Sequence, residues 1–391
     1  MKKRICFLVD SIFSIGGVQR VTAVIASALG KEYDVTIVTF DKPDTKDTSL
    51  YGLEGAHLHY RHFSYPQISK AEKKICKAYS WLYMRFQPQS RWTSMLYGLS
   101  SFPPTLRRAL TKELQDGHYD VIIGVHAPLA GRLATMKKDL KGAKTIGWIH
   151  NSYEALFGKK YLYIGYLRKR HYVHQFQRLD NVVLLCHHDM ETYQKYDSKF
   201  APSVIYNPLT LQPGMPSNGT SKRFLAVGRF SRRHKGFDLL IEAFKLFAQK
   251  DDEWQLDIVG EGDEGPLYRE LIGKYQLENR IHIHPFTNNI QEYYSKAQIY
   301  VLSSRWEGFG LVLVEAMAHG LPVVSSGLPT SLEIMGDFGI YFKNEDINDL
   351  ADKLMEATHI DWQKKSEEAL QIAHRFDIGH ITKQWKSLIE Q

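Results

Sequence analysis

The chain has 391 residues, of which 43% are hydrophobic and 24% charged, and its formal net charge is +7. These values are typical of a soluble globular protein large enough for two domains, and they exclude disordered and fibrous classes. No apolar run approaches the roughly 20 residues that span a bilayer, and the apolar stretch before Asp10 is too short for a signal peptide. The three cysteines are scattered without metal-ligand spacing, so we expect reduced thiols in a cytoplasmic protein.

Short apolar runs rich in β-branched residues alternate with amphipathic segments of helix length along most of the chain. Because consecutive parallel strands need long crossovers, this alternation predicts an α/β fold with doubly wound parallel sheets. The strands expected in the first half are Ile5–Asp10, Val35–Phe40, Val121–Val125, Thr145–His150 and Val182–Cys186. The first helix is expected over Val18–Leu29.

Two features of the first half lie at the ends of expected strands. Gly16 and Gly17 join the first strand to the first helix without the G-x-G-x-x-G spacing of dinucleotide binders, which disfavours hydride transfer. Paired glycines that open a helix still let an anion or a sugar approach the backbone. His150 ends the fourth expected strand, and we interpret it as a residue that faces a cleft, although a lone histidine is more often structural.

Two segments of the first half, Ser69–Lys112 and Phe157–Arg178, mix cations with aromatic residues and contain almost no acids. Such a mixture suits the surface of an anionic membrane, where charge and apolar burial add. The alternative is a solvated helix face whose aromatic residues enter the core. No groove-reading motif accompanies the segments, so we expect no nucleic-acid partner.

The stretch from Asn207 to Thr220 is rich in Pro, Gly, Asn and Ser, which is typical of a linker. We therefore predict one domain over residues 1–206 and a second over residues 207–375. The strands expected in the second domain are Phe224–Phe230, Gln255–Gly260, Ile281–Pro285, Ile299–Ser304, Val323–Ser325 and Gly339–Phe342. Its helices are expected over Phe237–Gln249, Gly265–Tyr275 and Leu311–His319.

The first strand of the second domain ends in a basic loop that contains Arg229 and Lys235. Two cations at the carboxyl end of a strand suit a diphosphate, because arginine offers a bidentate fork and lysine a point charge. Basic loops are common, so this signal is weak when taken alone. A second glycine-rich turn, Asp257–Asp263 with Glu261, either shapes a nucleotide pocket or is a tight connection.

The most informative segment runs from Ser303 to Val324 and predicts a strand, a glycine-rich turn, a helix and another strand. Gly308, Phe309 and Gly310 form the turn, where backbone N–H groups and the helix dipole favour a phosphate. Glu307 and Glu315 are eight residues apart and border the same turn. Glu315 interrupts an apolar helix, where a lone carboxylate is costly to bury. We therefore favour ligand contact over two ordinary surface glutamates.

Taken together, these residues resemble retaining glycosyltransferase family 4, most densely from Arg223 to Ser326. Glu307 and Glu315 match the E-x7-E signature of that family, and Gly16-Gly17 and His150 carry the thinner similarity of the first half. The resemblance implies the GT-B fold, with two Rossmann-like domains that face each other across a cleft. It also implies that the last helix, residues 376–391, crosses back to the first domain.

The resemblance assigns a role to each residue of the candidate site. It implies that Arg229 and Lys235 bind the diphosphate of the donor and stabilise the leaving group, and that Glu315 binds the ribose. Glu307 and the turn Gly308–Gly310 would contact the sugar and the phosphates. Gly16 and Gly17 would lie near the diphosphate or the acceptor, and His150 near the donor sugar. Arg232 and Arg233 lie in the same basic loop, so the motif alone leaves open which cation touches phosphate.

The implied reaction is transfer of a hexosyl group with retention of configuration, without a metal and without a cofactor other than the nucleotide-sugar co-substrate. The chain contains no D-x-D triplet that would hold a catalytic metal. A UDP-sugar is the expected donor, and a saccharide or polyprenyl-linked saccharide is the expected acceptor. Two alternatives stay open: a nucleotide-sugar epimerase or hydrolase on the same fold, and a non-catalytic membrane-binding protein.

Overall fold

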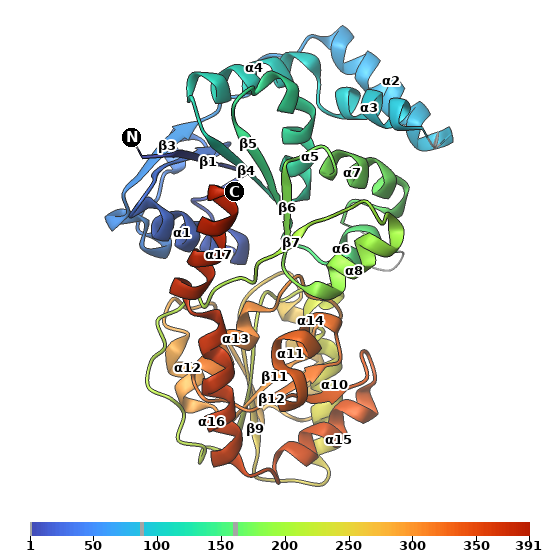
Figure 1. Cartoon of the computed structure of the whole chain (residues 1–391). Coiled ribbons are helices and arrows are strands. Elements are labelled where there is room, and N and C mark those ends of the chain that lie inside the picture. The colour runs from blue at the N-terminus through green and yellow to red at the C-terminus, as the bar shows by residue number, and fades with distance from the viewer. Residues whose placement is uncertain (1, 87–89, 159–162) are drawn as a thin grey trace. The chain divides into compact units, whose positions relative to one another are not determined.

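The computed structural model describes residues 2–86, 90–158 and 163–391, which form two compact units (Figure 1). Unit 1 comprises Met1–Pro208 and Ile378–Gln391, and unit 2 comprises Leu209–Asp377. The first boundary between the units follows Pro208, two residues after residue 206, where the linker composition predicts the end of the first domain. Within the described residues, no helix is both long enough and apolar enough to cross a membrane. Lys159, Lys160 and Tyr161, which belong to the second basic segment, lie outside the described residues.

Unit 1 contains a seven-stranded parallel sheet in the order β3-β2-β1-β4-β5-β6-β7. Its strands are β1 Arg4–Val9, β2 Asp34–Thr39, β3 Leu58–His62, β4 Val121–Val125, β5 Lys144–Trp148, β6 Asn181–Leu184 and β7 Ser203–Val204. The side chains of β1 from Ile5 to Leu8 are fully buried, as expected for a central strand covered on both faces. All five strands predicted for this half are present, whereas β3 and β7 were not predicted.

Most helices of unit 1 lie in the connections between its strands, and the connection after β3 contains three of them. They are α1 Gly17–Gly30, α2 Lys70–Phe86, α3 Arg91–Ser101, α4 Pro104–Asp116, α5 Ala127–Met136, α6 Tyr153–Phe157, α7 Lys169–Phe176, α8 His187–Tyr196 and α17 Ile378–Glu390. Helix α1 buries Val21, Ile25 and Leu29 at a spacing of four residues, so one apolar stripe faces the sheet.

The C-terminal helix α17 belongs to unit 1 and packs near α1 (Figure 1). Its Trp385 is fully buried, and the ring lies 4.8 Å from that of Trp148 at the end of β5. Glu390 pairs with Lys3 at 2.6 Å and accepts a hydrogen bond from the hydroxyl of Tyr33 at 2.9 Å. The chain thus leaves unit 2 after Asp377 and completes unit 1.

Unit 2 contains a six-stranded parallel sheet in the order β10-β9-β8-β11-β12-β13. Its strands are β8 Arg223–Val227, β9 Gln255–Val259, β10 Ile281–His284, β11 Ile299–Leu302, β12 Val323–Ser326 and β13 Ile340–Phe342. Its helices are α9 Arg232–Lys235, α10 Phe237–Ala248, α11 Gly265–Lys274, α12 Gln291–Lys296, α13 Leu311–Ala318, α14 Pro329–Met335, α15 Ile347–Ala357 and α16 Trp362–Ala373. The six predicted strands are all present, and the basic loop contains the additional one-turn helix α9.

Both sheets are doubly wound, which confirms the predicted fold class. In unit 1 the strand order reverses between β1 and β4, and in unit 2 it reverses between β8 and β11. Open parallel sheets bind ligands beyond the carboxyl ends of their strands at such reversal points. The topology therefore directs attention to the loops after β1, β4, β8 and β11.

Candidate functional site

The loops that follow β8 and β11 are locked together by their backbones at the reversal point of unit 2. Gly236 adopts a φ of +63°, and a β-carbon on it would lie 2.2 Å from the carbonyl oxygen of Ser303. Only glycine permits this approach. The hydroxyl of Ser303 donates a hydrogen bond to the carbonyl of Lys235 at 2.9 Å, and the amide of Arg305 donates one to the carbonyl of His234 at 2.7 Å. The basic loop and the glutamate loop therefore form one rigid structure.

Glu307 is buried within this structure and is held by three side chains. Its Oε1 accepts hydrogen bonds from Lys235 Nζ at 2.7 Å and from Ser304 Oγ at 2.6 Å. Its Oε2 lies 3.5 Å from His234 Nε2, and the His234 ring stacks on Trp306 with centroids 3.8 Å apart. Burial alone would raise the pKa of the Glu307 carboxyl, but the charges of Lys235 and His234 and the hydrogen bond from Lys235 outweigh it, so this pKa lies well below its usual range.

A second buried ion pair, which the sequence did not predict, fixes the same loops. The Arg305 guanidinium makes two hydrogen bonds to the Asp238 carboxylate, at 3.0 and 2.9 Å, and a third to Glu345 at 3.0 Å. It also donates to the carbonyl of Arg232 inside α9. Asp238 lies in the first turn of α10, so the arginine ties this helix to the basic loop and to the segment after β13. Arg305 and Asp238 therefore position the loops.

The basic loop has four arginine and lysine side chains, and they differ in whether they form ion pairs. Lys235 is paired with Glu307, and Arg232 pairs with Asp238 at 3.1 Å. Arg229 and Arg233 are exposed, and neither makes an ion pair with any residue that the structure describes. The structure therefore separates the two predicted cations: Lys235 already has a carboxylate partner, whereas Arg229 extends into solvent.

The glycine-rich turn presents the start of α13 beside Glu307. Gly310 adopts a φ of +86° at the N-cap of α13, and a β-carbon on it would meet Leu313 at 3.1 Å and Glu307 at 4.0 Å. Gly308 and Phe309 are buried before it. Helices leave their first N–H groups without intrahelical partners, so the start of α13 is suited to an anion.

Glu315 lies in α13 and is only 2% exposed. The Tyr294 hydroxyl of α12 donates to its Oε2 at 3.0 Å. His319 stacks on the ring of Tyr294, and its Nε2 accepts from the amide of Gly214 at 3.2 Å. His319 Nδ1 must then carry the proton that it donates to the carbonyl of Glu315 at 2.7 Å. Glu315 is thus buried with a polar partner, as the cost of burying a lone carboxylate requires.

The turn after β9 borders the basic loop through its backbone. The Phe230 amide donates to the carbonyl of Glu261 at 2.7 Å. Gly260 and Gly262 have φ values of +153° and +148°, and β-carbons there would collide with the carbonyls of Gly228 and Phe230. The Glu261 side chain itself is exposed. The structure therefore brings the three predicted loops of unit 2 together.

In unit 1, the loop that contains Gly16 and Gly17 follows β1 at the other reversal point. The Gly16 amide donates to the Tyr51 hydroxyl at 2.8 Å. The amides of Ile12 and Phe13 donate to Asp41 Oδ2 at 2.8 and 3.2 Å. The loop is thus held by side chains from beyond β2, and Gly17 at the start of α1 is exposed.

His150 lies two residues after β5 and is buried. Its ring packs 4.3 Å from Trp148, which contacts Trp385, and 5.3 Å from His126. Its Nε2 has no hydrogen-bond partner among the described residues. Burial, followed by the neighbouring His126, holds the pKa of His150 well below its usual range, so the ring is neutral at pH 7. An unpartnered buried ring nitrogen is suited to a ligand hydroxyl.

His126, which no sequence motif singled out, is the residue directly after β4. Its backbone has φ 75° and ψ 152°, a region that is almost reserved for glycine. Its amide donates to the carbonyl of Trp148 at 2.8 Å, which fixes this geometry. Such strain costs about 1–3 kcal/mol and concentrates at functional sites. The signal was present in the sequence, because His126 ends an apolar run just as His150 does.

We predict that the usual stability order of glycine and alanine is inverted at residue 126. His126→Gly should unfold at a higher temperature than His126→Ala by the equivalent of about 1–2 kcal/mol, because only alanine keeps the backbone strain. Thermal melts of both variants measure the difference. The pair Gln194→Gly and Gln194→Ala, on an exposed helical position, is the control and should show alanine as the more stable. An alanine variant at residue 126 that melts at or above the glycine variant contradicts the prediction.

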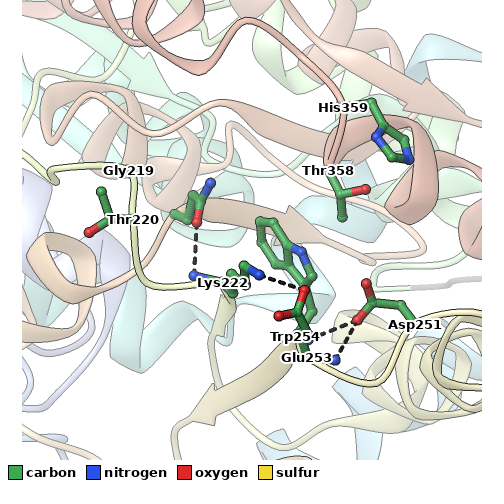
Figure 2. Close-up of a pocket in the computed structure, with 9 residues that line it drawn as sticks. Gly219, Thr220, Lys222, Asp251, Glu253, Trp254, Thr358 and His359 are labelled. Atoms are coloured by element: carbon green, nitrogen blue, oxygen red, sulfur yellow. Dashed lines mark hydrogen bonds and ion pairs between the residues drawn. The ribbon is translucent and has the colours of Figure 1, made fainter.

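A shallow pocket of about 340 Å³ lies at the opposite, amino-terminal ends of the unit 2 strands (Figure 2). It is lined in part by Lys222, Asp251, Trp254 and Gln298, which precede or flank the starts of β8, β9 and β11. The Lys222 amide donates to Gln298 Oε1 at 2.8 Å, and the Trp254 amide donates to Asp251 at 2.8 Å. Several of its polar groups are engaged with one another, and it lies at the opposite ends of the strands from the three interlocked loops.

Solved structures share this architecture. Anabaena HepE in complex with UDP and glucose aligns over the whole of both chains, with a TM-score of 0.74 and 20% identity. Staphylococcus aureus TarM aligns over 100% of this chain and 99% of its own, with a TM-score of 0.74 and 16% identity. These similarities show that the chain has the GT-B fold.

Sequence profiles define the family. A profile described as Glycosyltransferase Family 4 matches residues 15–212, and one described as Glycosyl transferases group 1 matches residues 211–375. The chain therefore belongs to glycosyltransferase family 4. An uncharacterized glycosyltransferase of Haemophilus influenzae is 26% identical over 99% of this chain and 100% of its own length.

Two further relatives match only in part. The poly(glycerol-phosphate) alpha-glucosyltransferase of Bacillus subtilis is 27% identical over 62% of this chain and 37% of its own length. The poly(ribitol-phosphate) alpha-N-acetylglucosaminyltransferase of Staphylococcus aureus is 29% identical over 41% of this chain and 34% of its own length.

Proposed function

We propose that the protein is a retaining hexosyltransferase that uses a nucleotide diphosphate-sugar, with UDP as the nucleotide. Its acceptor would be a saccharide or lipid-linked saccharide in cell-surface polysaccharide or glycoconjugate synthesis. The observation that carries the proposal is the group of interlocked loops at the β8/β11 reversal point, where free cations, a buried ion pair and the start of α13 meet. The names of the Bacillus and Staphylococcus relatives, both alpha-transferases, support retention, and the UDP complex of HepE supports the nucleotide.

In this proposal the diphosphate binds to Arg229 and Lys235, next to the start of α13. Negative charge grows on the leaving phosphate oxygen as the bond to the anomeric carbon breaks, and fixed cations stabilise that charge without reorganisation. Lys235 would bridge Glu307 and the phosphate, because an ammonium has three N–H donors. Arg233, exposed in the same loop, is a second candidate for the phosphate contact.

The remaining residues would hold the rest of the donor. The Glu315 carboxylate would accept hydrogen bonds from the hydroxyls of the ribose, and Tyr294 would keep this carboxylate in place. Glu307 and the backbone of Gly308–Gly310 would contact the sugar and phosphates, and Glu261 would border the nucleotide.

The residues of unit 1 would complete donor binding. Gly16 and Gly17 would let the diphosphate or the acceptor approach the backbone. The neutral ring of His150 would hydrogen-bond a hydroxyl of the donor sugar through its unpartnered Nε2.

The proposed reaction takes place on one face of the sugar. The acceptor oxygen bonds to the anomeric carbon on the face that the phosphate leaves, and the acceptor proton passes to the leaving phosphate. No metal takes part in this proposal, because the charge on the diphosphate is met by arginine and lysine. A polyprenyl-linked acceptor would sit in a bilayer, so an anionic membrane surface is a further proposed partner.

We expect transfer from a UDP-hexose to alkyl glycosides to proceed at an undiminished rate in EDTA and to give the same anomer as the donor. NMR spectroscopy of the product with a panel of UDP-sugars measures both outcomes. Activity that disappears in EDTA and returns with Mn²⁺ would contradict the metal-independent reaction, and an inverted product would contradict retention. Conversion of the donor to its epimer without any acceptor would instead indicate a nucleotide-sugar epimerase.

A further inference from the structure

Helices α2 and α3 form a hairpin whose orientation on unit 1 is fixed. The rings of Tyr83 and Tyr97 stack with centroids 4.3 Å apart, and the hydroxyls of Ser80 and Ser100 are hydrogen-bonded at 3.0 Å. The ring of Tyr97 in turn packs 4.7 Å from His171 of α7. One side of each helix thus packs against other helices of unit 1, and the opposite side faces solvent.

The outward face of α2 is a stripe of cations. Tyr79 and Tyr83 lie on the packed side, at a spacing of four residues. The residues on the opposite side follow at intervals of three or four, which is the repeat of one helix face. They are Lys70, Lys74, Lys77, Trp81 and Arg85, and all five are exposed. This stripe therefore places four cations and one tryptophan on the same surface.

The single acid of α2 is turned away from that stripe. Glu72 accepts hydrogen bonds from the amide and the hydroxyl of Thr105, at 2.8 and 2.6 Å. Thr105 lies in the first turn of α4, where a carboxylate meets free N–H groups and the positive end of the helix dipole. Glu72 therefore caps α4, and the charge of the outward face of α2 is uncompensated by its own helix.

Large apolar side chains are exposed on the same hairpin. Ile75, Trp81, Phe86 and Trp92 are 70%, 63%, 70% and 69% exposed, respectively. Other aromatic residues of the segment, such as Tyr97 and Phe102, are buried. The large apolar side chains of Ser69–Lys112 therefore divide into a buried group and an exposed group. Trp81 lies within the stripe of cations, and the Arg85 guanidinium lies 5.8 Å from the centre of the Phe86 ring. Exposed large apolar groups beside cations mark an interaction surface.

We propose that this α2–α3 surface docks the protein on an anionic membrane. Cations at such a surface are attracted to acidic headgroups, and tryptophan and other large apolar chains enter the boundary between headgroups and acyl chains. A soluble polyanion would satisfy the lysines but would leave Trp81, Phe86 and Trp92 in water. The inference extends the proposed function, because a lipid-linked acceptor lies in the membrane, but docking itself requires no transfer.

In the second basic segment Tyr163 and Tyr166 are exposed, but three of the described cations are engaged within unit 1. Lys169 lies over the rings of Tyr153 and Tyr196, at 5.8 and 4.5 Å. Arg168 donates to the carbonyl of Ile164 at 3.1 Å, and Arg178 donates to the side chain of Gln175 at 3.0 Å. These cations pack within unit 1, so the test concerns α2 and α3.

The test is co-sedimentation of the full chain with vesicles of phosphatidylglycerol and phosphatidylcholine, or of phosphatidylcholine alone. We expect the wild type to bind only the anionic vesicles. The triple variant K70E/K74E/K77E should bind them at least about tenfold more weakly, since each cation adds to the attraction. The pair W81S/W92S should also bind more weakly, because apolar burial contributes. The matched control K141E/K364E/K383E, which reverses three exposed lysines elsewhere and has the same net charge, should bind as the wild type does.

Equal binding of the wild type to neutral vesicles, or a control that loses as much binding as the K70E triple variant, would overturn the proposal. So would a W81S/W92S variant with undiminished vesicle binding, particularly if heparin competes for the wild type, because the surface would then be a site for soluble polyanions. Circular dichroism confirms that the variants fold. Transfer to a soluble alkyl glycoside should be unchanged in all of them, so a failure of docking is distinguished from a failure of the proposed reaction.

Discussion

Replacement of Glu307 by glutamine should lower kcat about 100-fold and leave the affinity for UDP within about threefold of the wild type. The variant loses a charge-assisted hydrogen bond worth roughly 1.5–3 kcal/mol, and an interaction made mainly in the transition state affects kcat and not the binding of UDP. The carboxylate is buried, and it is held by Lys235 at 2.7 Å and Ser304 at 2.6 Å. Glutamine keeps the shape and the hydrogen bond to Ser304 but removes the charge. Steady-state kinetics with a UDP-sugar and calorimetry with UDP measure the two quantities.

The same substitution should reduce stability in a manner that depends on pH. Lys235 is 12% exposed in its side chain, and removing one partner of a buried ion pair costs about 3–5 kcal/mol. The pKa of Glu307 in the folded protein lies below the ordinary glutamate value of 4.5. Its contribution to the free energy of unfolding is therefore complete above pH 4.5 and is lost as the pH falls toward the folded-state pKa.

Thermal melts of the wild type and Glu307→Gln across this pH range test this pH dependence. The difference between their melting temperatures should shrink only in acid. Glu270→Gln, at an exposed position of α11, is the control and should change neither melting nor turnover. A Glu307→Gln variant with wild-type kcat and wild-type stability would show that Glu307 does not belong to the donor site.

The fold and the candidate loops of unit 2 could be predicted because local patterns define them. Apolar runs mark the buried strands, and glycines mark the turns beyond β8, β9 and β11. Strand β3 escaped prediction because apolar and polar residues alternate in Leu58–His62, which lies at the edge of the sheet beside β2. Strand β7 has only two residues, which is too short to leave a pattern.

The contacts between distant side chains could not be predicted from the same patterns. Arg305 and Asp238 are separated by 67 residues, and nothing local indicates that they pair. Tyr294 supplies the partner of Glu315 from another helix, so the sequence implied that the carboxylate needed a partner without identifying it. The backbone strain of His126 depends on the neighbouring strand, whose Trp148 carbonyl fixes its amide.

A donor site at the β8/β11 reversal point predicts that UDP affinity depends on residues at one end of the unit 2 sheet and not on residues at the other. Calorimetric titration in EDTA compares the wild type with Arg229→Ala and Glu315→Gln at the carboxyl ends of the strands. Lys222→Gln, in the pocket at their amino-terminal ends, is the control (Figure 2). Each charge-assisted hydrogen bond is worth roughly 1.5–3 kcal/mol, so both test variants should bind UDP about tenfold or more weakly, provided that they melt as folded proteins.

We expect this loss of affinity in Arg229→Ala and Glu315→Gln together with an unchanged Kd in Lys222→Gln. Folded variants of Arg229 and Glu315 that bind UDP as tightly as the wild type, or a loss of binding in Lys222→Gln alone, would contradict a donor site at the β8/β11 reversal point.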